Sequence, residues 1–414
     1  MTRRWLGLVV VFACNGGGGG DGSTGSSTGD ATAPSTSTAL TTSPPADGSS
    51  EPGDTTSAPT TGEPPAGSSG AGTTTTAGDT GDTGTTTGEP VVDVPVFLAQ
   101  GHLGRTTISC DDGHTWIHDQ SVDDAARCFE DGLDCDHHAY AGRGVAWGDG
   151  AFVLAWGWGH PGTLVRSDDA ATFSVVMTDT PTFADVAFGA GRFVANNSTT
   201  AISVDLGEQW GPGGPLDIGI NTRAIEFVAQ DAGWFIVAGE SGDQRAVVRS
   251  PDGVTWTPAT TRPPECGAYT LGMAHGTGVT VMASGHGHVC TSPDGGDNWT
   301  YVPISERLTS PPLWTGGEFF VYEGGVVHRS PDGAAWSSTP LVGDGVVVGP
   351  LARSPEGTFV AANDGWMVWY DQQKFYRSSD GVTWDTLAAG TFTGGHPIYF
   401  MAHGRVKPGA GCPG

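Results

Sequence analysis

The stretch Arg249–Trp256 reads R-S-P-D-G-V-T-W, and it returns as R-S-P-D-G-A-A-W at Arg329–Trp336 and as R-S-S-D-G-V-T-W at Arg377–Trp384. More divergent copies of the same pattern begin at Ser109, Ser167, Ser203 and Ser292. Successive copies start between 36 (203 − 167) and 58 (167 − 109) residues apart. A period of this length indicates a fold built from repeated supersecondary units, such as the blades of a propeller.

Each copy has the composition of a tight turn. Asp and Ser side chains hydrogen-bond to backbone groups across such turns, and Gly supplies the positive φ that hairpins require. The closing Trp or Phe starts the next strand with a large apolar face. We therefore expect seven aspartates to be structural rather than catalytic: Asp111, Asp169, Asp205, Asp252, Asp294, Asp332 and Asp380.

The segments between the copies read as short strands. Residues 144–150, 151–157 and 162–169 give three strands before one copy, and residues 174–178 give a fourth after it. The chain is rich in Gly and shows no convincing amphipathic helix, so we predict an all-β fold of four-stranded blades arranged in a ring. Seven copies predict seven blades.

The two ends of the repeat region complete one blade. Residues 94–109 supply two strands without a first strand, and residues 396–406 supply a first strand with nothing after it. Pairing them closes the ring and removes unpaired strand edges.

With these seven segments, the chain resembles the Asp-box, or BNR-repeat, β-propellers over residues 95 to 406. Sialidases carry this motif, as do sortilin-type receptors and several non-enzymatic bacterial propellers. The resemblance implies that the loops between second and third strands lie on the face opposite the Asp turns, where ligands usually bind.

The chain begins M-T-R-R-W-L-G-L-V-V-V-F-A-C, with two Arg before an apolar run and a small residue before Cys14. The run is too short to span a bilayer. The pattern resembles a bacterial lipoprotein signal, so we expect residues 1–14 to direct lipidation of Cys14 and anchorage to a membrane. An ordinary secretory signal cut elsewhere is the alternative. We expect a cell-envelope location, at the outer membrane or cell surface rather than the inner membrane.

Residues 15–90 contain Gly, Ser, Thr, Pro, Ala, acids and one Asn, with Leu40 as the single large apolar residue. Such a segment cannot bury enough surface to offset its ordering entropy, so we expect a disordered linker before a propeller at 91–414. The net charge of −27 argues against nucleic acid as a partner. We expect a monomer.

Six cysteines follow Cys14, and an even number in an exported chain predicts three disulfides. We favour Cys110–Cys412, which would lock the closing blade, Cys266–Cys290, and Cys128–Cys135. A metal site at His286, His288 and Cys290 is an open alternative, although the spacing matches no known zinc motif. The acids Glu130, Asp131, Asp134 and Asp136 match no EF-hand loop. We expect no cofactor and no metal.

The loops between second and third strands carry side chains that suit sugar rings and hydroxyls. The candidate ligand-binding residues are His102, Arg105, Trp156, Trp158, His160, Glu240, His286, Trp366, Trp369 and Tyr370. Packing between blades is the alternative role for the tryptophans.

A sialidase-like glycoside hydrolase or lyase is the enzymatic alternative. Sialidases use an Arg triad, a Tyr nucleophile and acids. This chain has no R-I-P motif before its first copy, and Arg143, Arg223, Arg262, Tyr140 and Glu226 stand at no recognisable spacing. We therefore predict a glycan- or protein-binding module rather than an enzyme. A purely structural envelope protein is a third possibility.

Overall fold

The structure is a computed structural model of the full chain. It describes residues 93–102, 104–120, 141–157, 162–180, 182–216, 221–241, 244–363, 374–388, 397–409 and 411–412. All of these belong to one compact unit, Thr83–Gly414. The predicted signal at 1–14 and linker at 15–90 lie outside the described residues. The described part of the chain contains no helix, and hence none that could cross a membrane.

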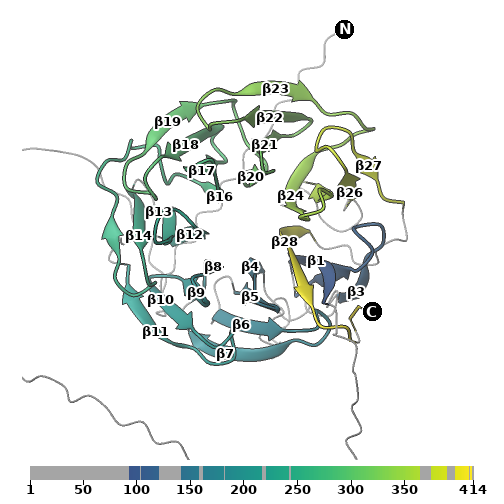
Figure 1. The fold of residues 1–414 in the computed structure, drawn as a ribbon, viewed down its shortest axis with the longest axis horizontal. Helices are drawn as coiled ribbons and strands as arrows, with labels where there is room; N and C mark the ends of the chain where they lie inside the picture. Colours follow the sequence, from purple (N-terminus) through teal and green to yellow (C-terminus); the bar gives the residue numbers. More distant parts are fainter. Residues whose placement is uncertain are drawn as a thin grey trace, which may run out of the picture. The chain divides into compact units, whose positions relative to one another are not determined.

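Twenty-eight strands form seven four-stranded antiparallel sheets, which confirms the predicted all-β propeller of seven blades (Figure 1). Blade 1 consists of β28 (Ile398–Val406), β1 (Val94–Gly101), β2 (Thr106–Ser109) and β3 (Ile117–Gln120). Blade 2 consists of β4 (Gly142–Gly148), β5 (Ala151–Trp156), β6 (Gly162–Ser167) and β7 (Ser174–Thr180). Blade 3 consists of β8 (Asp185–Gly189), β9 (Arg192–Asn196), β10 (Thr199–Ser203) and β11 (Gly211–Pro215).

The remaining four blades follow in chain order. Blade 4 consists of β12 (Asn221–Val228), β13 (Trp234–Ser241), β14 (Gln244–Ser250) and β15 (Thr257–Pro258). Blade 5 consists of β16 (Thr270–Gly276), β17 (Val279–Ser284), β18 (His288–Ser292) and β19 (Thr300–Pro303). Blade 6 consists of β20 (Leu313–Trp314), β21 (Phe319–Glu323), β22 (Val326–Ser330) and β23 (Ser337–Pro340). Blade 7 consists of β24 (Val348–Arg353), β25 (Phe359–Asn363), β26 (Phe375–Ser378) and β27 (Asp385–Thr386).

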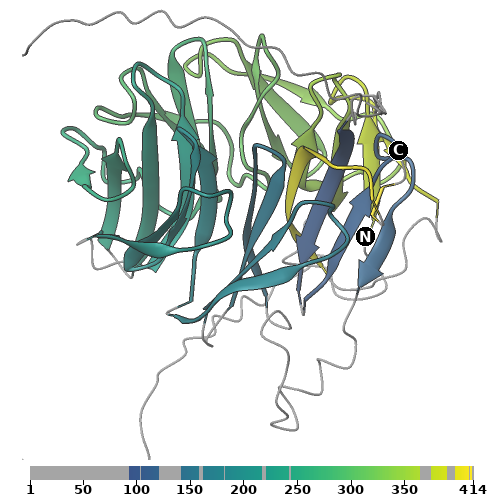
Figure 2. The same cartoon turned by 60° about the horizontal axis from the view of Figure 1, so that its bottom comes forward.

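The first strand of each blade faces the centre of the ring, and the fourth strand lies at its outer edge (Figures 1 and 2). The four strands of a blade run antiparallel. The start of the first strand therefore lies at the same end of the ring as the loop between the second and third strands. We call this end the loop face.

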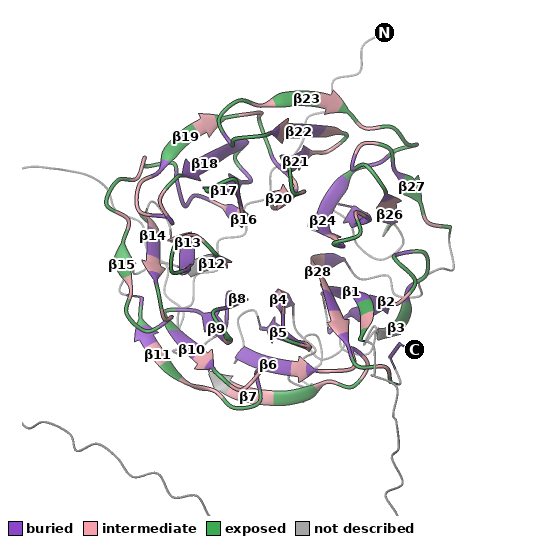
Figure 3. Cartoon of the chain, viewed as in Figure 1, coloured by how far each residue is buried: buried purple, intermediate pink, exposed green. Residues whose placement is uncertain are grey.

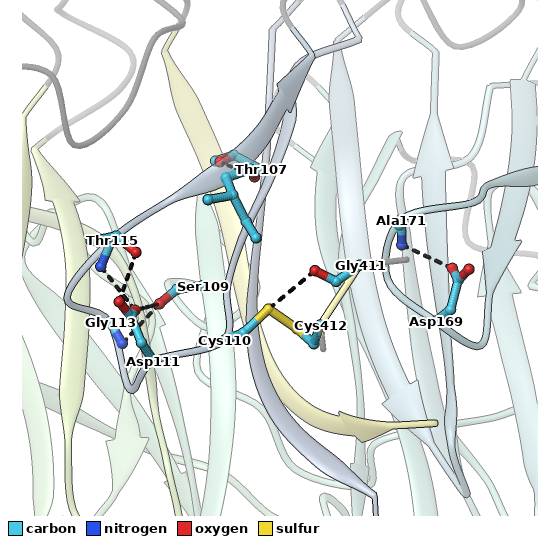
Figure 4. The surroundings of a disulfide bond; sticks show 11 residues. Thr107, Ser109, Cys110, Asp111, Gly113, Thr115, Asp169, Ala171, Gly411 and Cys412 are labelled. Carbon is cyan, nitrogen blue, oxygen red and sulfur yellow. Dashed lines mark hydrogen bonds between the residues drawn. A yellow bond between two sulfur atoms is a disulfide. The ribbon is translucent and has the colours of Figure 1, made fainter. Parts of the chain in front are cut away.

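The two ends of the chain close the ring as predicted. Strand β28 pairs with β1 from Val94↔Val406 to Gly101↔Ile398. A disulfide joins Cys110 to Cys412 across the same blade, with 5.6 Å between Cα atoms (Figure 4). The predicted Cys266–Cys290 disulfide is also present. Cys128 and Cys135 lie outside the described residues.

The core lies between neighbouring blades, and the buried residues follow the strands around the ring (Figure 3). One cluster joins Val281 and Val289 of blade 5 to Phe319 and Val321 of blade 6. Near the centre, an added Cβ at Gly148 would collide with the ring of Phe188 in the next blade. Gly at such positions lets the blades approach closely enough to exclude water.

All seven repeat segments adopt the same turn, which we call the Ser–Asp turn. In each, the Ser hydroxyl donates to the Asp carboxylate two residues later, at 2.6 to 3.1 Å. The carboxylate also accepts backbone N–H groups, as from Thr115 to Asp111 at 2.9 Å (Figure 4). These bonds lower the pKa of each Asp below its ordinary value, outweighing the opposite effect of burial where the carboxyl is partly buried.

Candidate functional site

Three predicted ligand-binding residues lie on the loop face with some exposed surface. The ring of His102 lies 6.1 Å from that of Tyr399, and the exposed His286 lies 5.5 Å from Tyr269. Glu240 lies 3.7 Å from the Nε of Arg245. They come from three different blades, 1, 5 and 4.

Two other candidates are buried, so we leave them out of the binding surface. Trp156 is 1% exposed and packs in the core between blades 1 and 2. Arg105 is 0% exposed, with its guanidinium 5.7 Å from the ring centre of Phe375. Trp156 therefore has the packing role that was the alternative for the tryptophans. Trp158, His160, Trp366, Trp369 and Tyr370 lie outside the described residues.

Three charged side chains come from the first strands of three consecutive blades, beside the centre of the ring. These are Arg143 on β4, Asp185 on β8 and Glu226 on β12. Asp185 accepts N–H bonds from Val186 at 2.8 Å and Ile225 at 3.1 Å, so its carboxylate joins blades 3 and 4. Arg143 donates from Nε to the carbonyl of Phe183 at 3.3 Å and attracts Asp185 electrostatically. The structure therefore brings together Arg143 and Glu226, which the sequence could not relate, around Asp185.

Burial shifts the pKa of both acids upward. Desolvation raises the pKa of Asp185 to about 7, against the opposing effect of its two N–H bonds and of Arg143. Desolvation and then repulsion by Asp185 raise the pKa of Glu226 to about 8. Both residues keep some exposed surface. The pair therefore holds protons near neutral pH instead of presenting two full negative charges.

Beside Asp185 and Glu226, the described residues do not form the Arg triad with a Tyr nucleophile that sialidases use. Arg262 donates to the carbonyls of Arg245 and Cys266, at 2.9 and 2.6 Å, and thus fixes the chain before β16. The side chain of Arg223 and all of Tyr140 lie outside what the structure describes. The groups that act on the pKa values of Asp185 and Glu226 are backbone N–H groups, Arg143 and, for Glu226, Asp185, and no tyrosine is among them in the described part of the chain.

A groove of about 270 Å³ lies between blades 2 and 3. We call it the blade 2–3 groove. It is lined by Met177, Phe183, Asn197, Thr199, Thr200, Ala201, Trp210, Gly211 and Pro212. Trp210 and Met177 are partly exposed, whereas Thr199 is exposed. The groove thus offers an aromatic and apolar wall with hydroxyl and amide groups at its edge.

Hydrogen bonds hold the groove's polar and aromatic groups in place. The Trp210 indole donates from Nε1 to the carbonyl of Gly207 at 3.0 Å. The Asn197 side-chain oxygen accepts the Thr199 N–H at 2.7 Å, which fixes the loop between β9 and β10. Sequence reasoning missed this groove, because Trp210 belongs to a Ser–Asp turn and was assigned a packing role there.

Metal ligation finds no support among the described residues, which contain no group of three His, Cys, Asp or Glu side chains placed to hold an ion. Cys290, one member of the proposed alternative site, is disulfide-bonded. His288 instead contacts the Glu265 carbonyl through Nε2 at 3.3 Å. The acids at 130–136 lie outside the described part of the chain.

Comparison with known proteins finds similar solved folds. No family model and no curated protein matches the chain. YCF48 bound to D1 peptide is 16% identical, covers 65% of this chain and 85% of its own, and gives a TM-score of 0.46. Virginiamycin B lyase from Staphylococcus aureus is 11% identical, covers 60% of this chain and 84% of its own, and gives a TM-score of 0.47. A protein of unknown function from Bacteroides caccae is 11% identical, covers 75% of this chain and 98% of its own, and gives a TM-score of 0.43.

Proposed function

We propose that this propeller is a glycan-binding module, and that its ligand occupies the blade 2–3 groove. The observation that carries the proposal is the partly exposed indole of Trp210 in a groove edged by Thr199 and Asn197. A flat aromatic ring suits the apolar face of a sugar, while hydroxyl and amide groups suit its hydroxyls.

The size of the groove limits the ligand. Its volume of about 270 Å³ lies just below the range of roughly 300–1,000 Å³ usual for small-molecule sites. One or two sugar rings would fill it, with the rest of a glycan in solvent. A short peptide carrying an aromatic or proline residue is the protein ligand that the same lining would accept.

A lipid anchor would place this module at a surface rich in glycans. We propose that Cys14 is lipidated and that residues 15–90 act as a spacer. A flexible chain of that length would span on the order of 50 Å. On this account, the protein is a monomeric lipoprotein of the cell envelope, in the wider class of Asp-box propellers, with a glycan or envelope protein as partner.

The test is a glycan array probed with the full chain and with two variants, Trp210→Ala and Trp336→Ala. Trp336 is the matched control, since its indole makes the same turn bond, to Gly333 at 2.8 Å, but does not line the groove. We expect saturable binding that Trp210→Ala abolishes and Trp336→Ala retains. An array that stays blank, or equal loss in both variants, would reject glycan binding in this groove. A parallel array in EDTA tests the expectation that no metal takes part.

A glycoside hydrolase or lyase is the second candidate, because Arg143, Asp185 and Glu226 meet beside the centre of the ring. Glycosidases use paired acids of which one carries a proton. Release of methylumbelliferone from a panel of glycosides, lost in Asp185→Asn, would support this candidate. No release from any glycoside would leave binding as the function.

A further inference from the structure

Three side chains in blade 6 form a line from the loop face to the outer edge of the ring. They are Glu323 on β21, His328 on β22 and Ser338 on β23. The Ser338 hydroxyl lies 2.8 Å from Nδ1 of His328, and Nε2 of His328 lies 3.3 Å from Oε2 of Glu323. The imidazole is buried, at 3% exposure, while Ser338 is exposed.

The strand register explains why the three meet. His328 stands directly opposite Ser338, and Glu323 opposite Val326, two residues before His328 on the same face of the sheet. Opposite and diagonal neighbours on one face of a sheet are within side-chain reach. The line is therefore fixed by three paired strands and does not depend on a loop.

The contacts indicate one arrangement of protons. Burial lowers the pKa of His328 and the neighbouring Glu323 opposes that shift, so the imidazole can be neutral near pH 7. With the proton on Nε2, facing Glu323, Nδ1 is the acceptor and Ser338 must donate to it. The Nε2–H does not point straight at the carboxylate, so this contact is electrostatic. Such contacts often tighten when substrate binds.

The other blades serve as internal comparisons, because they repeat the same pair of positions. In five of the other six blades the pairs corresponding to His328 and Ser338 are Val165–Val175, Ala201–Pro212, Val248–Pro258, Cys290–Tyr301 and Tyr376–Thr386. In blade 1 the register is irregular, and the Thr107 hydroxyl donates to the carbonyl of Ile117. None of these pairs joins a base to a hydroxyl. The blade fold therefore does not require His328 and Ser338.

We propose that Ser338, His328 and Glu323 form a site for hydrolysis of small carboxylic esters. Ser338 is the nucleophile, His328 the general base, and Glu323 the positioning residue that orients the imidazole. A nucleophile hydrogen-bonded to a base, which a third group orients, is the arrangement of serine hydrolases on unrelated folds. Because Ser338 lies on an exposed outer strand, the site favours small acyl groups with good leaving groups.

The reaction has two halves. Ser338 Oγ attacks the acyl carbon while its proton passes to Nδ1 of His328, and Glu323 stabilises the imidazolium. The tetrahedral intermediate collapses, the C–O bond to the leaving group breaks, and Nδ1 returns the proton to the departing alcohol. Water then attacks the acyl-serine with His328 as base, releasing the carboxylic acid and restoring Ser338.

The ladder also supplies a donor for the developing oxyanion. Leu341 N–H bonds to the Gly325 carbonyl at 2.8 Å, so Gly325 and Leu341 are a hydrogen-bonded pair. Hydrogen-bonded and non-hydrogen-bonded pairs alternate along an antiparallel ladder, so His328 and Ser338 form a non-hydrogen-bonded pair. The Ser338 N–H therefore points away from β22, toward the outer edge, where an acyl oxygen could accept it.

The test uses a fluorophosphonate probe on the full chain, with the adduct mapped by mass spectrometry, and p-nitrophenyl acetate as substrate. We expect an adduct on Ser338 and a burst of nitrophenolate. Both should be lost in Ser338→Ala, and the rate should fall at least about 100-fold in His328→Gln. Ser337→Ala is the matched control, since Ser337 is exposed on the same strand but faces the other way.

Glu323→Gln keeps the fold testable if the buried His328→Gln variant fails to fold. Loss of the carboxylate removes the group that raises the pKa of His328. We therefore expect a slower labelling rate, whose pH midpoint moves to lower pH, while the circular dichroism spectrum is unchanged. No adduct on Ser338, equal labelling of Ser338→Ala and Ser337→Ala, or a pH midpoint unmoved in Glu323→Gln would overturn the proposal.

Discussion

Arg377, in the third strand of blade 7, donates from Nε to the backbone carbonyl of Asp112, in the Ser–Asp turn of blade 1, at 2.8 Å. Arg166 makes the same contact from Nε to the carbonyl of Leu206 at 2.8 Å, and Arg249 donates from Nη1 to the carbonyl of Asp294 at 3.1 Å, each in the turn of the next blade. In these three blades, the Arg that precedes the Ser–Asp turn therefore binds the turn of the next blade, whereas Arg329 of blade 6 contacts Thr339 and Glu318 of its own blade. At Arg377 this fastening closes the ring.

Replacing Arg377 by Met should lower the free energy of unfolding by about 1–2 kcal/mol, because its charge-assisted bond to the Asp112 carbonyl and its ion pair with the Asp112 carboxylate are both lost. Arg405→Met is the control. Arg405 crosses the same seam to Glu356 at 2.9 Å, but both side chains are well exposed, and exposed ion pairs contribute about 0–1 kcal/mol. Urea titration of both variants measures the two losses of unfolding free energy. Equal losses would show that Arg377 has no special part in closing the ring.

Loss of the Cys110–Cys412 disulfide should destabilise the propeller more than loss of Cys266–Cys290. The sequence separations are 302 and 24 residues. On the chain-entropy account, the longer loop contributes about 2 kcal/mol more. Denaturant unfolding of the two double Cys→Ser variants measures the difference. A larger loss for Cys266→Ser/Cys290→Ser would contradict closure of the ring as the main role of the first bond.

The Ser–Asp turns should make the propeller sensitive to acid. The seven Asp carboxyls have folded-state pKa values below the ordinary value. Their stabilisation is therefore present above the unfolded-state pKa of about 3.9 and is lost as pH falls through the folded values. Asp252→Asn should lower Tm at pH 7, with a difference that shrinks below pH 4. A difference that persists at pH 2.5 would contradict this role for ionised Asp252.

Asp185 and Glu226 should make the stability of the propeller fall as pH rises, the opposite of the effect of the Ser–Asp turns. Asp185 and Glu226 have folded pKa values of about 7 and about 8. The stability linked to their protonated forms is present below the unfolded pKa of about 4 and is lost as pH rises through 7 and 8. We expect Glu226→Gln to stabilise the propeller by about 1–3 kcal/mol at pH 9, after allowance for partial exposure, and little at pH 5. Equal stabilisation by Glu226→Gln at pH 9 and pH 5 would contradict a raised pKa for Glu226.

Much of the fold could be predicted from the repeated turn. The spacing of the Ser–Asp segments fixed the number of blades, and the unmatched strands at the two ends predicted the pairing of β28 with β1. The binding surface was harder to predict. Trp156 and Arg105 stand in loop-like sequence, yet both are buried, because neighbouring blades cover them. Whether a Trp is buried or exposed depends on the side chains of the neighbouring blade, and the repeated turn segment does not predict those contacts.

The groove and the Ser338 site were missed for a related reason. Trp210 and Met177 line one groove only because blades 2 and 3 pack side by side. Ser338 and His328 are ten residues apart, and only the register of β22 with β23 makes them neighbours. A shift by one residue would place them on opposite faces.

A crystal structure of the full chain soaked with the tightest-binding saccharide from the array tests the central claim most directly. The account predicts a sugar ring in the blade 2–3 groove, stacked on the Trp210 indole with a hydroxyl near Thr199. Sugar density beside Asp185 and Glu226, or on the loop face at His102 or His286 with the groove empty, would contradict it.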